Sequence, residues 1–215
     1  MNHTQEKPMM LFNNKGFTLI EIAIVLIIIG IIIGAVVKGK DVMKSAQQKQ
    51  LYTKYLKAWE LTYNNYYDRT GWILGDDASD NNATRDGQCG NGGVASEGNI
   101  QGQLDMVGID PPAQGSTGSI LQRTYTDSQG IRRTLQLAFD NDTNLGNFIR
   151  IYSTNGIPYD LGMAWDRVVD GTMDGTAGNL RYTANYTAAS IVTAAWPDAD
   201  AASVANSAIL FLLEF

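Results

Sequence analysis

The sequence predicts an α+β fold in which one long N-terminal α-helix packs on a C-terminal antiparallel β-sheet. Three observations predict it. Residues 17–37 form an apolar run with a single charged residue. No proline occurs from Phe17 to Thr70, and apolar residues recur at helical spacing in the second half of that stretch. Strand-like runs separated by turn residues then follow residue 118.

The apolar run FTLIEIAIVLIIIGIIIGAVV has 21 residues, and its one charge is Glu21. A helix of this length covers about 31 Å, close to the roughly 30 Å of a bilayer's hydrocarbon layer. Gly30 and Gly34 are spaced as in helix-packing faces of small residues. The polar leader precedes the run, and no small-residue cleavage site follows Val37. We therefore expect a membrane helix that stays on the mature protein.

Glu21 is unusual because a carboxylate in the middle of a membrane helix costs about 2.5–3.5 kcal/mol on insertion scales and usually has a function. Two simpler interpretations stand beside a functional one. An acid in the first turn of a helix gains about 0.3–1 kcal/mol from the helix dipole. The side chain could also lie at the level of the lipid headgroups.

The helix is predicted to continue beyond the membrane, over residues 38–70, as an amphipathic segment. Its apolar residues are separated by three or four positions, apart from one adjacent pair, which places them on one face. That face should pack on the sheet, and it comprises Tyr52, Tyr55, Leu56, Trp59, Tyr63 and Tyr66. Asn64-Asn65 and Gly71 are signals for the end of the helix.

Residues 71–215 should form a globular head. Residues 71–118 are rich in Gly, Asn, Asp and Ser and are expected to be loops, with a short helical turn at 103–108. Residues 119–215 contain the predicted sheet. Its antiparallel strands are expected at 119–127, 131–139 and 147–153, and a last strand at 208–215 should close it.

Composition excludes several classes of function. All eight lysines lie within the first 57 residues, and residues 61–215 hold eight arginines against 18 acids, a net charge of −10. Direct nucleic-acid binding is therefore not expected. With Cys89 as the only cysteine and His3 as the only histidine, an intrachain disulfide is excluded. A Cys–His nucleophile and a zinc site are not expected either. We predict no catalytic residue and no enzyme activity, and Cys89 is expected to be a non-functional thiol.

The string Lys15-Gly16-Phe17-Thr18-Leu19-Ile20-Glu21 resembles the processing signal of type IV pilins and of the pseudopilins of type II secretion systems. The resemblance implies that a prepilin peptidase cleaves between Gly16 and Phe17 and N-methylates Phe17. It also implies that Glu21 pairs with the free amine of Phe17 in a neighbouring subunit. Two unit charges about 4 Å apart attract by about 4 kcal/mol at an effective dielectric of 20, so this pairing would set the register between copies.

The same resemblance implies a pilin-like organisation. Residues 1–16 are the leader peptide, 17–37 the transmembrane and filament-core helix, 38–70 the amphipathic continuation, and 71–215 a periplasmic head. The subunit is expected in the bacterial inner membrane, crossing it once, and then in a helical filament in the periplasm or at the cell surface. Its expected partners are further copies of itself, the prepilin peptidase, an inner-membrane assembly platform and other minor pilins or pseudopilins.

Two alternatives stay open. The chain could be a single-pass anchored periplasmic domain that binds a ligand, although such an anchor needs neither the leader nor Glu21. It could also be a minor pilin for DNA uptake, which the acidic head disfavours. The sequence does not separate a type IV pilus subunit from a type II secretion pseudopilin.

One further candidate site lies in residues 158–182, which resemble a stretch common in pilin-like proteins but lack the second acid of its D-D-G motif. Asp166, Asp170 and Asp174 could supply oxygen ligands to Ca²⁺, as some pseudopilins bind calcium in a head loop. The alternative is that these aspartates cap turns and helix ends. No other cofactor is expected.

Overall fold

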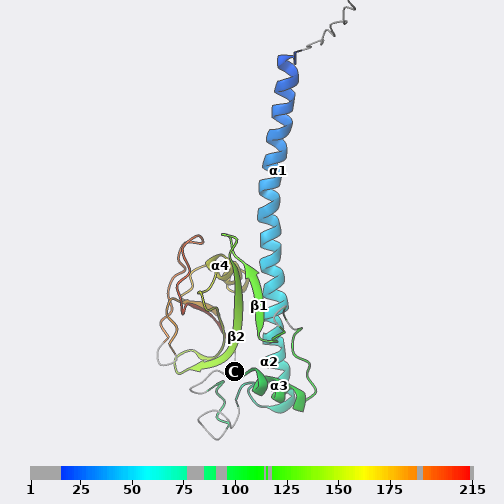
Figure 1. The fold of residues 1–215 in the computed structure, drawn as a ribbon. Coiled ribbons are helices and arrows are strands. Elements are labelled where there is room, and N and C mark those ends of the chain that lie inside the picture. Colours follow the sequence, from blue (N-terminus) through cyan, green and yellow to red (C-terminus); the bar gives the residue numbers. More distant parts are fainter. Residues whose placement is uncertain are drawn as a thin grey trace, which may run out of the picture. The chain divides into compact units, whose positions relative to one another are not determined.

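The computed structural model describes residues 16–76, 85–90, 96–113, 115, 118–187 and 191–213. The chain divides into two units, Met1–Lys44 and Ser45–Phe215. Its secondary structure combines a long N-terminal apolar helix with a five-stranded antiparallel sheet (Figure 1). The predicted α+β fold class is therefore confirmed. Most of the predicted leader lies outside the described residues.

The described part of the first unit is helical from Leu19 onward. Helix α1 (Leu19–Leu51) begins here and ends in the second unit. Every residue from Gly16 to Met43 is exposed, including a nearly unbroken series of Ile, Val and Leu side chains. Among the described residues, one helical stretch, Leu19–Thr70, is long and apolar enough to cross a membrane by length and composition.

The helix is not α-helical throughout, which corrects the prediction of one unbroken α-helix. A π-helix, η1 (Tyr52–Leu56), separates α1 from α2 (Lys57–Thr70). In it the Lys57 N–H donates to the Tyr52 carbonyl, five residues earlier. The helix ends at Gly71, which adopts φ 69° and donates its N–H to the Tyr67 carbonyl. The predicted stop at Gly71 is thus confirmed.

The aromatic face of this helix forms the centre of the head's core. Tyr55, Trp59 and Tyr63 are fully buried. Trp59 and Tyr63 both contact the ring of Phe139 on the sheet, with ring centroids 5.7 and 6.0 Å apart respectively. Aromatic side chains bury 150–250 Å² each, so this face supplies much of the hydrophobic free energy of the head. The predicted packing of the helix on the sheet is confirmed.

The sheet contains β1 (Gln122–Thr126), β2 (Arg132–Asp142), β3 (Gly146–Tyr152), β4 (Leu180–Thr183) and β5 (Ala208–Leu212). Their order is β1-β2-β3-β5-β4, and every neighbouring pair is antiparallel. The three-strand meander was predicted. The last strand does not close the sheet, however, because β4 lies outside it at the edge. Strand β4 was not predicted, and residues 214–215 of the predicted last strand lie outside the described residues.

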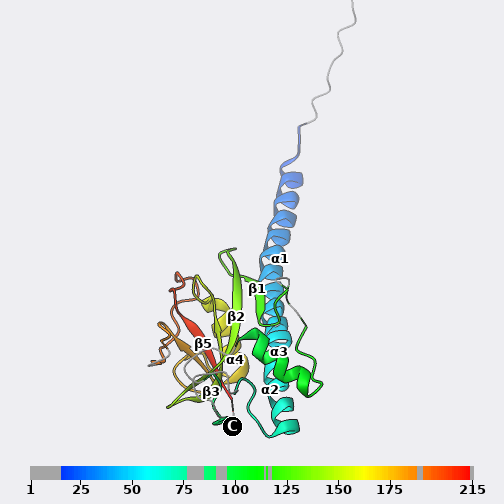
Figure 2. The ribbon, with the colours of Figure 1, turned by 60° about the horizontal axis from the view of Figure 1, so that its bottom comes forward.

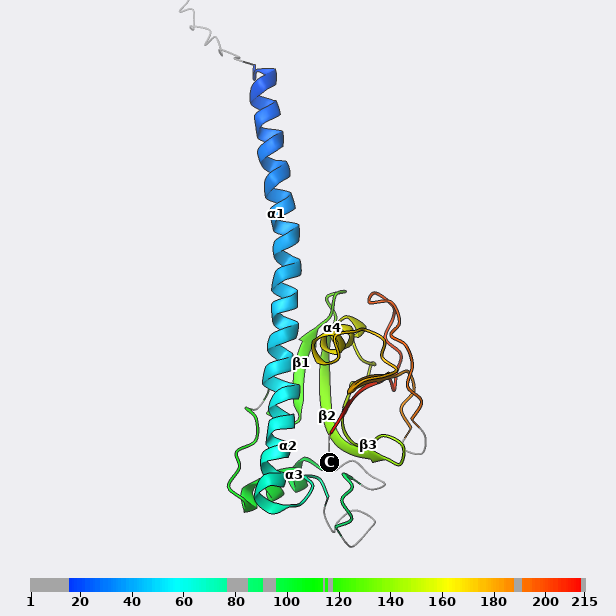
Figure 3. The ribbon, with the colours of Figure 1, turned by 180° about the vertical axis from the view of Figure 1, so that it is seen from behind.

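Two short helices complete the described fold (Figures 2 and 3). Helix α3 (Glu97–Met106) is longer than the turn predicted at 103–108, because Ser96 caps it by accepting a hydrogen bond from the Asn99 N–H. Helix α4 (Tyr159–Val169) was not predicted. Figure 3 shows α3 and α4 toward opposite ends of the sheet.

Candidate functional site

The predicted cleavage site lies immediately before α1. Gly16, Phe17 and Thr18 are outside regular secondary structure, and α1 begins at Leu19. The Phe17 residue is 83% exposed. A protease needs an accessible, extended backbone, and glycine before the bond offers no side chain to obstruct it. The bond between Gly16 and Phe17 is therefore open to a peptidase.

Thr18 and Glu21 form a reciprocal cap at the start of α1. The Thr18 N–H and hydroxyl both donate to Glu21 Oε2, at 2.7 and 2.8 Å. In return the Glu21 N–H donates to Thr18 Oγ1 at 3.3 Å. This Thr-x-x-Glu arrangement is a capping box, which satisfies two donors that a helix N-terminus otherwise leaves unpaired.

The capping box shows how one copy of the chain accommodates the carboxylate of Glu21. Both bonds that it accepts go to Oε2, and Oε1 accepts none from a described residue. An ionised carboxylate has room for about four hydrogen bonds. The helix-cap role raised from sequence is therefore present, and the second oxygen stays available to a donor from another molecule. Pairing of Glu21 with the Phe17 amine of a neighbour stays a prediction.

The three candidate calcium ligands lie around the loop between α4 and β4, and each holds loop backbone. Asp166 Oδ2 accepts from Trp196 Nε1 at 2.7 Å and from the Gly175 N–H at 3.2 Å. The Asp170 carboxylate accepts the N–H groups of residues 179 and 180. Asp174 Oδ1 accepts those of residues 176 and 177. These contacts are the turn-capping role that the sequence left open beside calcium.

The described residues contain no group of three or more His, Cys, Asp or Glu side chains placed to hold a metal ion. Asp166 Oδ1 is nevertheless buried and without a hydrogen-bond partner among them. Burial raises the pKa of Asp166, while the bonds from Trp196 and Gly175 oppose the rise. Backbone hydrogen bonds lower the pKa of Asp174. Calcium binding at Asp166, Asp170 and Asp174 stays a prediction.

Cys89 lies inside the core. Its thiol donates to the Leu74 carbonyl at 3.3 Å, and its N–H donates to Asn147 Oδ1 at 2.9 Å. Burial raises the pKa of the Cys89 thiol well above its usual range. A thiol in this state is neither a thiolate nucleophile nor accessible to reagents at neutral pH.

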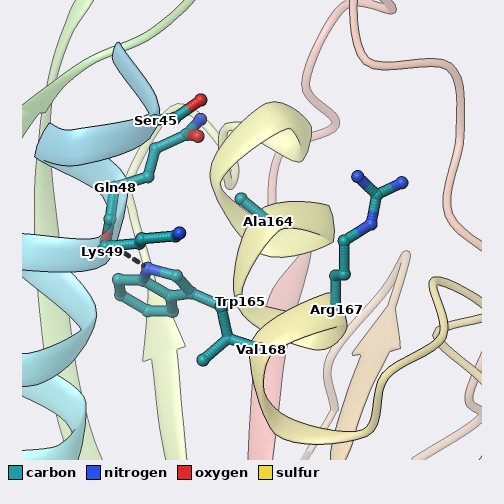
Figure 4. A pocket seen from close by; sticks show the side chains of 7 residues that line it. All are labelled: Ser45, Gln48, Lys49, Ala164, Trp165, Arg167 and Val168. Carbon is teal, nitrogen blue, oxygen red and sulfur yellow. Dashed lines mark hydrogen bonds between the residues drawn. The ribbon is translucent and has the colours of Figure 1, made fainter. Parts of the chain in front are cut away.

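A cavity of about 280 Å³, not found by sequence reasoning, lies in the second unit between the end of α1 and α4 (Figure 4). It is lined by Ser45, Gln48, Lys49, Ala164, Trp165, Arg167 and Val168. The buried Gln48 side chain donates to Tyr125 Oη at 3.0 Å and to the Asp160 carbonyl at 3.2 Å. Trp165 Nε1 donates to the Gln48 carbonyl at 3.0 Å. These bonds fix the two helices that form the walls.

Sequence reasoning missed this cavity because it missed α4. Leu161 and Trp165, four positions apart and both buried, were the available signal for an amphipathic helix. Residues 158–182 were instead interpreted through their likeness to a family stretch. That interpretation drew attention to the aspartates and away from Arg167.

Comparison with known proteins supports the N-terminal part of this site. Residues 11–37 match the family model described as the prokaryotic N-terminal methylation motif. This motif is the prepilin-type cleavage and methylation signal of type IV pilins and pseudopilins, and the resemblance seen in the sequence is confirmed for it. None of the curated proteins and none of the solved structures compared with the chain matches it.

Proposed function

We propose that this chain is a structural subunit, a pilin or pseudopilin, of a type IV filament assembly. A prepilin peptidase would cleave it between Gly16 and Phe17, methylate the new N-terminus and release a chain that polymerises through its N-terminal helix. The observation that carries the proposal is a methylation motif over residues 11–37 that runs directly into an exposed apolar helix.

The exposed helix supports self-association. Apolar side chains from Leu19 to Met43 have no partner among the described residues of the first unit. A contiguous apolar surface of this extent indicates contact with lipid or protein. Each Å² of apolar surface that leaves water contributes about 25 cal/mol, so transfer into a membrane or a bundle of such helices is strongly favourable.

Glu21 would supply the specificity of that association. The capping box satisfies Oε2 within the chain, and Oε1 could accept a hydrogen bond from the N-methylated amine of a neighbour's Phe17. Each group alone would be costly in an apolar environment, because an unpaired buried charge carries a large desolvation penalty. Copies would therefore be stable side by side only in a register that brings the two groups together.

The proposed setting follows from the motif. The chain would cross the bacterial inner membrane once, with its head in the periplasm, and pass through an inner-membrane assembly platform. It would join other minor pilins or pseudopilins in a filament in the periplasm or at the cell surface. The filament would serve type II secretion or a type IV pilus, and the subunit would have no catalytic role.

The mature N-terminus tests the proposal. We expect intact-mass and peptide mass spectrometry of the chain from native membranes to show a start at N-methyl-Phe17. A host without prepilin peptidase, and a Gly16→Val variant in the normal host, should both retain the start at Met1. A wild-type chain that begins at Met1 in a host with active peptidase would contradict the proposal and favour the anchored ligand-binding domain.

Calcium binding by Asp166, Asp170 and Asp174 is a separate and weaker proposal, supported by the unpartnered oxygen of Asp166. A rise in melting temperature on adding CaCl₂ that disappears in Asp170→Asn would support it. An unchanged melting temperature in calcium and in EDTA would leave the aspartates with their turn-capping role alone.

A further inference from the structure

The cavity between α1 and α4 carries two cations with no internal partner. Lys49 on α1 and Arg167 on α4 are both exposed, and neither side chain makes a hydrogen bond or ion pair with another described residue. Three other basic side chains of the second unit each form an ion pair with a carboxylate. Lys57 pairs with Glu60 at 2.7 Å, Arg133 with Asp127 at 3.0 Å and Arg150 with Asp140 at 3.3 Å.

The surroundings of Lys49 and Arg167 strengthen their attraction for an anion. Figure 4 shows Lys49 reaching from α1 toward α4, and Arg167 standing on the other side of Ala164. Trp165 and the half-exposed Val168 give the cavity an apolar wall. Charges beside apolar surface interact more strongly than charges in open water, because less solvent screens them.

The same chain presents a matching pair of carboxylates. Asp198 and Asp200 lie in a turn, both are exposed, and neither carboxylate makes a hydrogen bond or ion pair with another described residue. The backbone of the turn is held in place. The Ala201 N–H donates to the Asp198 carbonyl at 2.9 Å, and Gln129 Nε2 donates to the Asp200 carbonyl at 2.8 Å.

We propose that the cavity lined by Lys49 and Arg167 receives the Asp198–Asp200 turn of a second copy of this chain. The inference rests on the proposed filament function and names a head-level contact between its subunits. Within the described part of one copy, the two cations and the two carboxylates have no side-chain partner. Because the turn is already ordered, little conformational entropy is lost when it docks.

This contact has the symmetry that a filament needs. The cavity and the turn are different surfaces, so each copy that binds through its turn still offers an empty cavity to the next copy. Such heterologous contacts generate an open helical assembly when the rotation between subunits does not close into a ring. Charge complementarity at the contact would favour this register over one that places like charges opposite one another.

Charge reversal in the full chain tests the inference. One variant carries Lys49→Asp with Arg167→Asp, a second carries Asp198→Lys with Asp200→Lys, and a third carries all four changes. A matched control carries Lys54→Asp with Arg132→Asp, two exposed cations outside the cavity. Each is expressed in the native host. The fraction of cleaved chain in sheared filaments is measured against the total cleaved chain, which also reports folding.

We expect each double reversal to lower the filament fraction about tenfold, and the fourfold variant to return it to within about twofold of wild type. The control should stay within about twofold, because exposed charges contribute little. If a reversed head fails to accumulate, the neutral pair Lys49→Gln with Arg167→Gln gives a smaller loss in the same direction.

Two results would overturn the inference. One is a fourfold variant that assembles no better than the double reversals. The other is a turn reversal without effect, which would point to a soluble anionic ligand in the cavity. A wild-type chain that is cleaved but never appears in filaments would instead sink the proposed function. If wild type forms filaments and neither double reversal lowers the filament fraction, only this contact is contradicted.

Discussion

The two units of the chain use apolar residues in opposite ways. From Leu19 to Val37 the helix is built mostly of Ile, Val and Leu, and every residue is exposed. From Tyr55 to Tyr66 its apolar face is aromatic, and that face is buried. The difference teaches where each segment finds its partners. The aromatic segment packs on the chain's own sheet, whereas the aliphatic segment has to be covered by other molecules.

The choice of residue type has a physical reason. Aliphatic side chains have no polar atoms, so they suit lipid or helix-packing surfaces equally well. A buried tyrosine hydroxyl usually finds a hydrogen-bond partner. Tyr55 finds one in the Leu121 carbonyl, to which its hydroxyl donates at 2.7 Å. The apolar residues of the helix thus change from aliphatic to aromatic where the helix changes from exposed to buried in the head.

The largest expected effect separates the two segments directly. Trp59→Ala should destabilise the head by about 3–5 kcal/mol, because it empties the centre of the core. Ile28→Ala, on an exposed position of α1, should leave the head's unfolding free energy within about 0.5 kcal/mol of wild type. Urea unfolding of the full chain in detergent, followed by near-UV circular dichroism, measures both. Equal losses in the two variants would contradict the comparison.

A smaller effect concerns packing inside the head. In Gly162→Ala the new methyl group would meet the ring of Trp196, so we expect a loss of about 1–3 kcal/mol. Gly102→Ala is a matched control on α3, because its methyl group would meet no atom within 4 Å. The control should gain up to about 1 kcal/mol from helix propensity. Thermal unfolding of both variants measures the difference, and a stabilised Gly162→Ala would refute the packing.

The capping box should matter to the first unit alone. Thr18→Ala removes the hydroxyl that caps α1 and should cost the first helical turn about 1 kcal/mol, whereas Thr18→Ser should retain it. Amide hydrogen exchange of the cleaved chain in micelles should become about fivefold faster over residues 19–22. Exchange in the head should not change. Faster exchange throughout the head would mean that the two units unfold together.

The smallest effect is a pH dependence within the head. Burial raises the folded-state pKa of Asp166, so the folded chain holds this proton more tightly than the unfolded chain. The resulting contribution to stability is complete below the unfolded pKa of about 3.9 and is lost as the pH rises through the folded pKa. The stability of wild type relative to Asp166→Asn should therefore fall above pH 4. Denaturant unfolding across acidic pH measures it, and a rise would reverse the assignment.

Sequence predicted those parts of the fold that depend on local patterns. The helix stop at Gly71 and the strands of the meander are encoded by residues close together in the chain. Strand β4 has only four residues, Leu180–Thr183, and its pairing with β5 is a long-range contact. The π-helix is a second such feature, and the Gln48 carbonyl four residues before it accepts a long-range hydrogen bond from Trp165 Nε1. No local sequence pattern predicts strand β4 or the π-helix.

The candidate sites divide in the same way. Thr18 and Glu21 are three residues apart, so both the motif and its capping box can be found from sequence. The cavity is lined by Lys49 and Arg167, which are 118 positions apart, and the second of them lies on a helix that was not predicted. Acidic and basic residues could be counted from the sequence. Which of them lack a partner became visible only in the folded chain.

The π-helix has a consequence for the phase of the long helix. A helical turn that contains one extra residue rotates all later residues by about 100° relative to their positions in a regular α-helix. Gln48, which lies before the π-helix, and Tyr55, which lies within it, both face the head, where they bond to Tyr125 and to the Leu121 carbonyl. The irregular turn thus sets the angle between the helical face before it and the face after it. A deletion or insertion of one residue there would turn the preceding face away from Tyr125 without altering any apolar residue.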